Sequence, residues 1–360
     1  MTRNPTGNQS EDGSAQRRSR DRGAAKGTTI KDVARKADVS QGTVSRVING
    51  LGVSAELRER VTQAIAELHY QPSEIARSMR TSTTRTVGLV ITDISNPVLA
   101  AIARGAEEVL YPLGYTLIVG NTARHLEREA SLIKTLVHRR VDGLLITVED
   151  EENPAVREAV ANVGVPVVLV DRDLLLPLDR VHVDHAKGVR MATEYLISLG
   201  HRRIAIITAA RSVFPGRDRV RGFETALQSA GLPIDPELIH SRSLTAQYSF
   251  RVASALLTSP FPPTAIIAGG NQIFEGLLEA VRLRGLSIPD QLSIIACDDT
   301  PLTRLGSPPV TVVQRDLNLL GKLSAEMLFE RISGECVTGE RSVLLPTSLV
   351  VRESCRPLQK

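Results

Sequence analysis

The spacing of hydrophobic residues changes near residue 86 of the chain. Between residues 29 and 71, apolar side chains recur three and four positions apart, as Ile30, Val33 and Ala34 do, which is the spacing of amphipathic helices. From residue 86 onward, short continuous runs of Val, Ile and Leu alternate with helical stretches. The pattern predicts a small all-α unit followed by a larger α/β body.

Three short helices are expected in the first unit. Thr29, with Asp32 three residues later, resembles a capping box at the start of the first helix. Ser40 is a suitable N-cap for a second helix, and Ser54 is one for a third that ends before Pro72. Three helices that share one apolar core would form a helix-turn-helix unit.

Seven apolar runs in the α/β body are strand candidates, at residues 86–92, 115–119, 142–147, 165–171, 203–208, 264–268 and 292–297. Continuous apolar strands separated by helices predict doubly wound parallel sheets that are covered on both faces. The body is too long for one ordinary sheet, and residues 181–188 near its midpoint are expected to cross between two similar subdomains. Because ligands of such sheets bind beyond the carboxyl ends of the strands, a small molecule is expected between the subdomains.

Basic residues are concentrated in the N-terminal part of the chain. Residues 1–80 hold 14 Lys and Arg against 9 Asp and Glu, a balance of +5, and residues 81–360 hold 30 against 31, a balance of −1. This distribution is typical of a small module that binds nucleic-acid phosphates joined to a near-neutral body, although a solvated tail alone gives the same balance.

The composition favours a cytoplasmic protein that makes no membrane contact. No run of about 18 uncharged apolar residues occurs, and the first thirty residues have no apolar leader segment. The cysteines Cys297, Cys336 and Cys355 are odd in number and far apart, so reduced thiols are expected.

The motifs that mark common enzyme classes are absent from the sequence. No GxGxxG follows the first strand, and there is no GxxxxGK[ST], GxSxG or HExxH. His182, His185 and His201 are not spaced as metal ligands, and capping or surface roles are expected for them. Of the adjacent Asp298 and Asp299, only one should enter a pocket, because neighbouring strand residues point to opposite faces. We therefore expect no catalysis, no cofactor and no metal site.

Eight segments, in order along the chain, resemble the lactose/galactose repressor family of bacterial transcription regulators. The most specific are TIKDVARKADVSQGTVSRVING at 29–50 and HYQPSEIARSMRT at 69–81. The others lie at 93–108, 139–146, 199–208, 218–223, 296–301 and 344–355. The resemblance covers the chain from about Thr29 to its end. It implies a helix-turn-helix headpiece, a hinge helix and a two-lobed core resembling periplasmic sugar-binding proteins, working as a dimer or a pair of dimers on a pseudo-palindromic operator. Of the two assemblies, a homodimer is expected.

The domain boundaries follow from these patterns and the resemblance together. Residues 1–27 are expected to be a disordered basic arm, 28–71 the helix-turn-helix domain, 72–84 the hinge helix and linker, and 85–360 the effector-binding and dimerisation core. Lobe 1 of that core is expected at about 85–184 plus 316–345, and lobe 2 at about 185–315 plus 346–358.

The resemblance implies that the helix beginning at Ser40 lies in the major groove of DNA. Gln41, Gly42 and Arg46 occupy the base-reading positions; Gln can hydrogen-bond an adenine edge and Arg can bind guanine or phosphate. Gly42 departs from the pattern, because it has no side chain to read with. The predicted DNA-binding residues are Thr29, Ser40, Gln41, Gly42, Thr43, Ser45, Arg46 and Asn49 in the headpiece, and Ile75, Ala76 and Met79 in the hinge. Met79 is expected to wedge between base steps, with packing against its own core as the alternative.

The effector-binding positions implied by the resemblance are Asn96, Asp171, Arg172, Arg219, Asn271 and Asp298. Salt bridging between the lobes is the alternative role for Asp171, Arg219 and Asp298. Val98 and Leu99 stand where many relatives carry aromatic residues, Arg172 and Leu244 align roughly with other aromatic positions, and Gly270 replaces a frequent Asn. Platforms for stacking a sugar ring are therefore scarce, which favours an acidic or open-chain polyol-like ligand held by Arg172 and Arg219.

The sequence therefore predicts a repressor whose operator affinity is controlled by a sugar, sugar acid or polyol. A regulator that uses a nucleobase co-repressor is the nearest alternative, and a Rossmann-type enzyme is a distant one. A periplasmic solute-binding protein would fit the α/β body but not the basic headpiece.

Overall fold

The computed structural model describes residues 28–71, 83–335 and 338–358. The chain divides into two compact units between Ser82 and Thr83. None of the described helices is long and apolar enough to cross a membrane.

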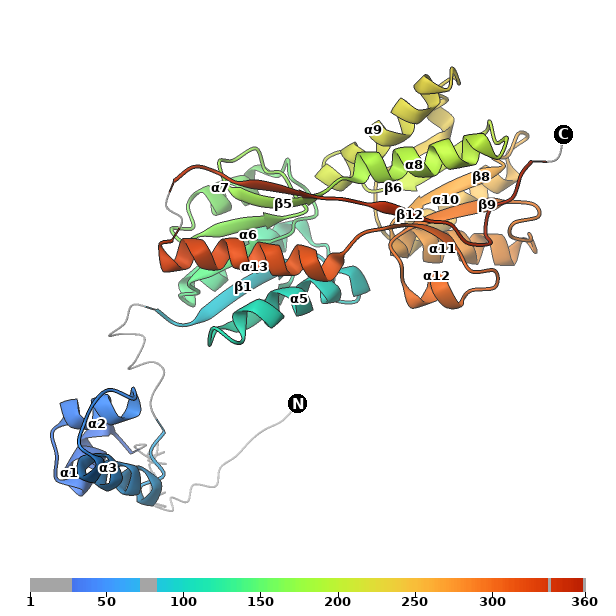
Figure 1. The fold of residues 1–360 in the computed structure, drawn as a ribbon. Coiled ribbons are helices and arrows are strands. Elements are labelled where there is room, and N and C mark those ends of the chain that lie inside the picture. The colour runs from blue at the N-terminus through green and yellow to red at the C-terminus, as the bar shows by residue number, and fades with distance from the viewer. Residues whose placement is uncertain (1–27, 72–82, 336–337, 359–360) are drawn as a thin grey trace, which may run out of the picture. The chain divides into compact units, whose positions relative to one another are not determined.

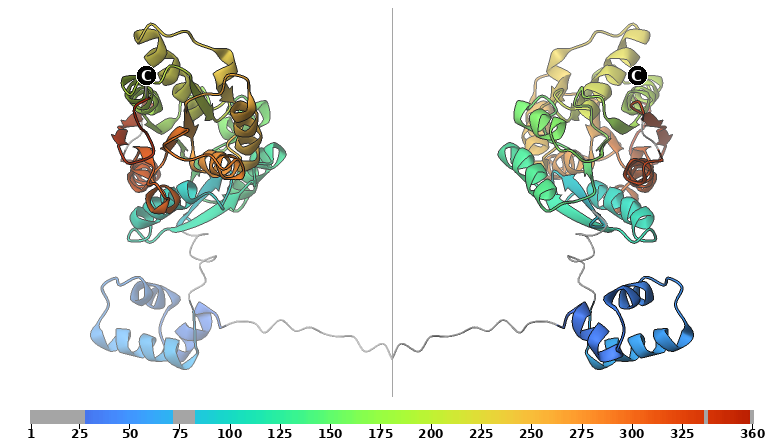
Figure 2. Two further views of the ribbon diagram at one scale, coloured as in Figure 1. Left: turned by 90° about the vertical axis from the view of Figure 1, so that its right-hand side faces the viewer. Right: turned by 90° about the vertical axis from the view of Figure 1, so that its left-hand side faces the viewer.

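The first unit is built from α1 (Ile30–Ala37), α2 (Gln41–Ile48) and α3 (Ala55–Glu67). Helix α1 packs against both of the others, and Figure 2 shows the three helices in blue. Val33, Val44 and Val61, one from each helix, are completely buried at the centre. The predicted all-α unit with one shared core is therefore confirmed.

The three predicted helix starts are present. The Thr29 hydroxyl and backbone N–H both donate to the Asp32 carboxylate, at 2.7 and 3.0 Å. Ser40 Oγ accepts from the Thr43 N–H at 3.1 Å, and Ser54 Oγ accepts from the N–H of the third helical residue at 3.4 Å. Each contact satisfies a backbone or hydroxyl donor that the first turn of a helix would otherwise leave open.

Lobe 1 of the second unit is a six-stranded sheet in the order β11-β5-β4-β3-β1-β2. Its strands are β1 (Thr86–Ile91), β2 (Thr116–Asn121), β3 (Gly143–Ile146), β4 (Val167–Val170), β5 (Asp179–Val183) and β11 (Ser342–Leu345). One face is covered by α5 (Pro97–Leu110) and α13 (Leu317–Ser333), and the other by α6 (Leu126–His138) and α7 (Pro154–Ala161). Alternate residues of β1 face the two layers: Val87 and Leu89 contact the first, and Val90 contacts the second.

Lobe 2 repeats this arrangement in the order β12-β10-β9-β8-β6-β7. Its strands are β6 (Ile204–Thr208), β7 (Ile239–Ser241), β8 (Ala265–Gly269), β9 (Ser293–Cys297), β10 (Thr311–Gln314) and β12 (Ser348–Val350). Helices α8 (His185–Ser198) and α9 (Phe214–Ser229) cover one face, and α10 (Ala246–Thr258) and α11 (Asn271–Leu283) cover the other. The short η1 (Pro236–Leu238) and α12 (Pro301–Leu305) complete the lobe.

The α/β fold class and the seven predicted strands are confirmed. Five further strands, β5, β7, β10, β11 and β12, were not predicted, because they are short and carry polar residues or few apolar ones. Strand pairs in both sheets are parallel except β10 with β12, which is antiparallel. That pair departs from the all-parallel expectation.

The chain crosses between the lobes at residue 184, at 315–316 and at 346–347, so the lobes are joined along one side (Figure 1). After the second crossing, α13 docks closely on α5. A Cβ atom on Gly105 would lie 2.1 Å from the Asn318 carbonyl oxygen, and one on Gly321 would lie 2.1 Å from the Ile102 carbonyl oxygen. Only glycine permits this approach, which fixes the start of α13 and therefore the position of Arg315 just before it.

Candidate functional site

Helix α2 presents one face to the core and the opposite face to solvent. Val44 and Val47 are buried, whereas Gln41, Gly42 and Arg46 are exposed. The predicted base-reading positions therefore share the exposed side of one short helix, where a nucleic-acid groove can reach them. Their contact with DNA stays a prediction.

The other predicted DNA-binding side chains of this helix are partly occupied by local hydrogen bonds. Ser40 Oγ and Thr43 Oγ1 lie 3.0 Å apart. Asn49 Nδ2 donates to the Ser45 carbonyl oxygen at 2.7 Å and to Ser45 Oγ at 3.3 Å. The hydroxyl of Thr29 donates to the carboxylate that caps α1. These groups have a structural role. A phosphate contact would use the hydrogen-bonding positions that the local bonds leave free.

The turn between α1 and α2 is held by a residue that was not predicted. Arg60 of α3 donates through Nη2 to the Ala37 carbonyl at 2.7 Å and to the Asp38 carbonyl at 2.9 Å. Asp38 has a φ of 51°, which is unfavourable for a residue with a side chain. Arg60 therefore stabilises the strained turn that sets the angle between the two helices. The predicted hinge residues Ile75, Ala76 and Met79 lie outside the described residues.

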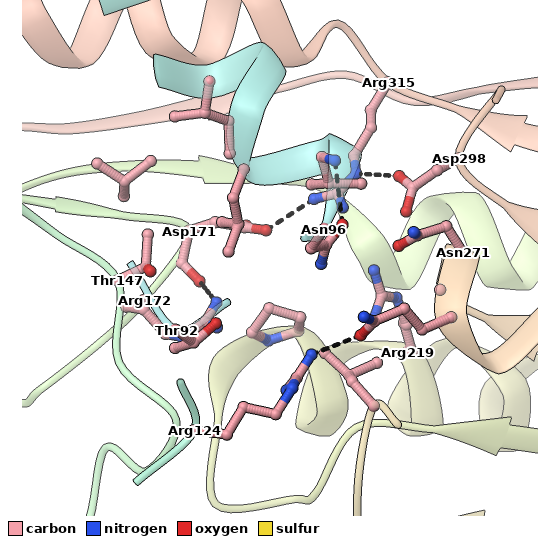
Figure 3. Close-up of a pocket in the computed structure, with 18 residues that line it drawn as sticks. Thr92, Asn96, Arg124, Thr147, Asp171, Arg172, Arg219, Asn271, Asp298 and Arg315 are labelled. Carbon is pink, nitrogen blue, oxygen red and sulfur yellow. Dashed lines mark hydrogen bonds and ion pairs between the residues drawn. The ribbon is translucent and has the colours of Figure 1, made fainter. Parts of the chain in front are cut away.

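The six predicted effector-binding residues all line one pocket between the lobes (Figure 3). Asp171 directly follows β4, Asp298 directly follows β9, and Asn96 caps α5 just beyond β1. Asn271 begins α11 after β8, and Arg219 comes from α9. The strand ends of both sheets converge here, which is the expected ligand position for this architecture.

Arg315 joins the two lobes inside this pocket. Its Nη1 lies 2.8 Å from Asp171 Oδ2 in lobe 1, and its Nε lies 2.6 Å from Asp298 Oδ1 in lobe 2 (Figure 3). All three side chains are buried. The salt bridging between lobes that we considered for Asp171 and Asp298 is therefore present, with Arg315 as the shared partner, and both carboxylates also line the pocket.

Both carboxyl groups are ionised in this environment. Burial by itself would raise the pKa of Asp171, but His185 and Arg315 hold that pKa far below its usual range. Burial likewise opposes ionisation of Asp298, and the adjacent Arg315 lowers the pKa despite it. Burial lowers the pKa of His185 to about 4, so a neutral imidazole donates from Nε2 to Asp171 at 3.0 Å near neutral pH.

The two arginines expected to hold the ligand differ in what their guanidinium groups contact. Arg172 donates from Nε to the Val148 carbonyl oxygen at 2.6 Å and from Nη1 to the Asp171 carbonyl oxygen at 2.8 Å. Arg219 donates from Nη1 to the Gly269 carbonyl oxygen at 2.8 Å. Arg172 is therefore largely engaged in holding the loops that follow β3 and β4.

Two buried donors of lobe 2 have no hydrogen-bond partner among the described residues. These are Nε of Arg219 and Nδ2 of Asn271. Both side chains are almost fully buried, at 2% and 6% exposed. Because an unpartnered buried donor costs on the order of 1 to 3 kcal/mol, such groups are expected where a ligand supplies the missing acceptor.

Further polar contacts join lobe 1 to lobe 2. Gln272 of α11 accepts from Arg124 at 2.6 Å and donates to Asp93 at 3.0 Å. Glu151 Oε1 accepts the backbone N–H of Phe214, the first residue of α9, at 2.7 Å. Both contacts must break if the lobes separate, so they favour the closed arrangement.

Aliphatic side chains form the rest of the pocket wall. Val98, Leu99, Ile102, Val170, Pro215 and Leu244 are among the lining residues. None of the described lining residues is aromatic, which agrees with the predicted scarcity of stacking platforms. Gly270 has a φ of 153° and ψ of 158°, a conformation adopted almost solely by glycine, and Leu244 would contact a side chain there.

Several lining residues were not predicted. Thr92 and Thr147 follow β1 and β3 directly, so the position of those strand ends could have identified them. Arg315 follows β10, a strand too short to be predicted, and Arg124 and Gln272 meet each other only across the two lobes, which no local pattern shows.

The expectation of capping or surface roles for the three histidines was wrong. His182, His185 and His201 are all buried. The ring of His182 stacks on Phe214 with centroids 4.1 Å apart, and His185 bonds Asp171. His201 Nδ1 lies 2.9 Å from Thr264 Oγ1. Their partners are distant in sequence, so the local pattern gave no sign of this burial.

Comparisons with known proteins agree with these features. A model of bacterial regulatory proteins of the lacI family matches residues 29–73, and one of a periplasmic binding protein-like domain matches residues 193–355. A ribose operon repressor of Haemophilus influenzae is 36% identical over 92% of this chain and 99% of its own length. A crystal structure of the lac repressor dimer bound to operator and the anti-inducer ONPF has a TM-score of 0.81 at 30% identity, covering 92% of this chain and 100% of that one.

A structure of the transcriptional regulator CelR in complex with cellobiose has a TM-score of 0.70 at 31% identity, covering 91% of this chain and 99% of that one. The resemblance drawn from the sequence is confirmed. The chain belongs to the lacI family of bacterial regulatory proteins and is a metabolite-controlled, DNA-binding transcriptional repressor.

Proposed function

We propose that this repressor reads its operator with the exposed face of α2 and senses a carbohydrate-related metabolite in the pocket around Arg219. The proposal rests on that pocket, where Asp171, Asn271 and Asp298, which follow strands of the two lobes, meet Arg219 of helix α9. A ligand held between the lobes shifts the equilibrium between their open and closed arrangements.

In this proposal Gln41 and Arg46 contact base edges, and Ser40, Thr43, Ser45 and Asn49 lie near phosphates. Both base readers are exposed on the same side of α2, and neither is needed for the buried core. Gly42 has no side chain to contact a base, so at this position the backbone itself approaches the DNA closely. Thr29 contacts DNA from the start of α1, and the hinge contacts it through Ile75, Ala76 and Met79.

The pocket's chemistry supports a polar, hydroxyl-bearing effector. It combines buried hydrogen-bonding groups with an aliphatic wall, a combination that fixes orientation while excluding water. The names of the ribose operon repressor and the CelR–cellobiose complex associate those relatives with sugars. The nucleobase alternative is less well supported, because the described lining offers no aromatic ring for stacking a flat base.

We further propose that the protein acts as a homodimer on chromosomal DNA in the cytoplasm. Strand β2 is at the edge of its sheet and exposes Ile118 and Val119, and exposed apolar edges are usually covered in the native assembly. A two-fold dimer would present its two headpieces to the halves of a pseudo-palindromic site.

Selection from randomised duplex DNA tests the reading of the operator. The full chain should enrich one two-fold symmetric sequence, and Arg46→Ala should lose preference at one position of each half-site, at a cost of about 1 to 3 kcal/mol. The exposed Arg58 of α3 serves as a matched control, since Arg58→Ala should leave the selected sequence unchanged. An unchanged sequence preference in Arg46→Ala would contradict the assignment.

A further inference from the structure

The hydrogen-bond acceptors and donors of the pocket are unequally available to a ligand. Both oxygens of Asp171 are used: Oδ1 accepts from the backbone N–H of Val183 at 3.3 Å and from His185 at 3.0 Å, and Oδ2 accepts from Arg315 at 2.8 Å. Asp298 Oδ1 accepts from Arg315 Nε at 2.6 Å, and Asp298 Oδ2 remains available to a ligand. Three of the four carboxylate oxygens in the pocket are therefore already hydrogen-bonded.

Two hydrogen-bond donors in the pocket, by contrast, remain available to a ligand. Arg219 Nε and Asn271 Nδ2 are buried without partners among the described residues, and both side chains come from lobe 2 on the same side of the pocket (Figure 3). A ligand that completes this site must bring acceptor atoms to these two donors. A hydroxyl group offers one oxygen and must turn its own proton away from these donors, whereas a carboxylate offers two oxygens, four lone-pair positions and no proton.

The charge at the centre of the pocket also favours an anionic ligand. Three lining guanidinium groups, those of Arg172, Arg219 and Arg315, accompany the two carboxylates of Asp171 and Asp298. The fourth lining arginine, Arg124, is paired at the pocket's edge with Glu149 at 2.9 Å and Asp93 at 3.5 Å. Arg172 also interacts with the buried Glu151, whereas the only hydrogen bond of Arg219 among the described residues goes to the Gly269 carbonyl oxygen, so an anionic group on the ligand would be balanced chiefly by Arg219.

We propose that the effector is a sugar acid of five or six carbons whose carboxylate accepts hydrogen bonds from Arg219 and Asn271 and whose hydroxyl groups reach Asp298 Oδ2. This inference rests on the proposed function and names the ligand class of the same pocket. The carboxylate belongs beside lobe 2, and the carbon chain lies along the aliphatic wall of Val98, Leu99 and Leu244. Charge-assisted hydrogen bonds of this kind are stronger than those of a neutral hydroxyl.

Matched pairs of compounds test the proposal on the full chain. Isothermal titration would compare D-gluconate with D-glucitol, D-ribonate with ribitol, D-glucuronate with D-glucose and D-galacturonate with D-galactose. At least one acid should bind, and it should bind ten or more times more tightly than its neutral partner. A neutral compound that binds as tightly as its acid, or a panel in which no acid binds, would overturn the inference.

Two substitutions locate the carboxylate. Arg219→Gln removes the charge, and Asn271→Asp replaces the donor with a carboxylate of the same shape, so each should weaken the acid at least tenfold and its neutral partner less than threefold. Arg251→Gln, at an exposed arginine of α10 in the same lobe, is the control and should bind the acid as the native chain does. Unchanged acid affinity in Asn271→Asp would contradict the assignment even if Arg219→Gln fails to fold.

The operator response separates this inference from the proposed function. A neutral sugar that binds and alters operator affinity would overturn the sugar-acid inference and leave the proposed function standing. An acid that binds as described but leaves operator affinity unchanged would support the inference and contradict the proposed function.

Discussion

Arg315 Nη1 lies 2.8 Å from Asp171 Oδ2, so the residue at which the chain crosses between the lobes is bound to the end of strand β4 in lobe 1. The same guanidinium contacts Asp298 in lobe 2. One side chain thus neutralises a buried carboxylate in each lobe and ties the lobes together next to the ligand.

Arg315→Gln should strongly destabilise the core, because it leaves two buried carboxylates without their counter-ion. Breaking a buried ion pair in this way costs about 3 to 5 kcal/mol. The free energy of unfolding measured by urea denaturation with circular dichroism checks this value. Arg304→Gln removes a half-exposed arginine 3.4 Å from Asp299 and is expected to cost less than about 1 kcal/mol. Equal losses in the two variants would contradict the buried bridge.

Glu129→Gln should stabilise the protein at alkaline pH. Glu129 is buried, its Oε1 accepts the Glu149 N–H at 2.7 Å, and its Oε2 has no partner among the described residues. Burial raises the pKa of this carboxyl to about 7. A raised pKa means that the folded state favours the protonated form, so stability is fully present below about pH 4.5 and is lost as the pH rises through 7.

Glutamine mimics the protonated carboxyl and retains the Oε1 acceptor. The variant should therefore be more stable than the native chain by about 2 to 3 kcal/mol at pH 8 and by less than about 1 kcal/mol at pH 5. Titration of His185 is common to both proteins and cancels in the difference. Glu107→Gln, at an exposed position of α5, is the control and should show no such difference between the two pH values. A pH-independent difference for Glu129→Gln would show that Glu129 is ionised in the fold.

Gly42→Ala should stabilise the headpiece and change its sequence preference. A Cβ atom at this position would lie 3.5 Å from Ser40 Oγ, an ordinary contact, so the methyl group fits. Replacing glycine by alanine inside a helix contributes about 0.5 to 1 kcal/mol. Hydrogen exchange of the α2 amides in the full chain would measure the gain, and duplex selection would report the altered base preference. Slower exchange without any change in preference would remove position 42 from the DNA interface.

Arg60→Ala should loosen the turn between α1 and α2. The substitution removes two hydrogen bonds from a charged donor to backbone carbonyls, which we expect to cost about 1 to 2 kcal/mol locally. Faster hydrogen exchange should be confined to the headpiece, and the ligand affinity of the core should not change. The same exchange rates in Arg60→Ala and the native chain would mean that the turn does not depend on this residue.

The sequence predicted those parts of the fold that depend on local pattern. Caps such as Ser40 and Ser54 were found because a side chain bonds the backbone three residues away, and the longer apolar strands were found because they are continuous. Asp171 and Asp298 were placed correctly at the pocket because each directly follows such a strand.

Features that depend on contacts between distant segments could not be predicted in this way. Arg315 follows a four-residue strand, and its partners lie 144 and 17 residues away in sequence. The burial of His185 depends on Asp171, which lies in the other lobe, and on the approach of Phe214 from helix α9 of its own lobe. Such interactions form only when segments distant in sequence meet in the folded core. The spacing of residues along the chain therefore does not reveal them.

We expect one small molecule in the pocket to control binding to one operator. The most direct test is fluorescence anisotropy of the full chain on its selected duplex and on a scrambled duplex, at fixed salt, with pooled sugars, sugar acids, polyols and nucleobases. The selected duplex should bind at least about a thousandfold more tightly than the scrambled one, and one pool should change that affinity by about 5- to 150-fold. Equal affinity for both duplexes, or no pool with more than a twofold effect, would show that a small molecule does not control operator binding in this way.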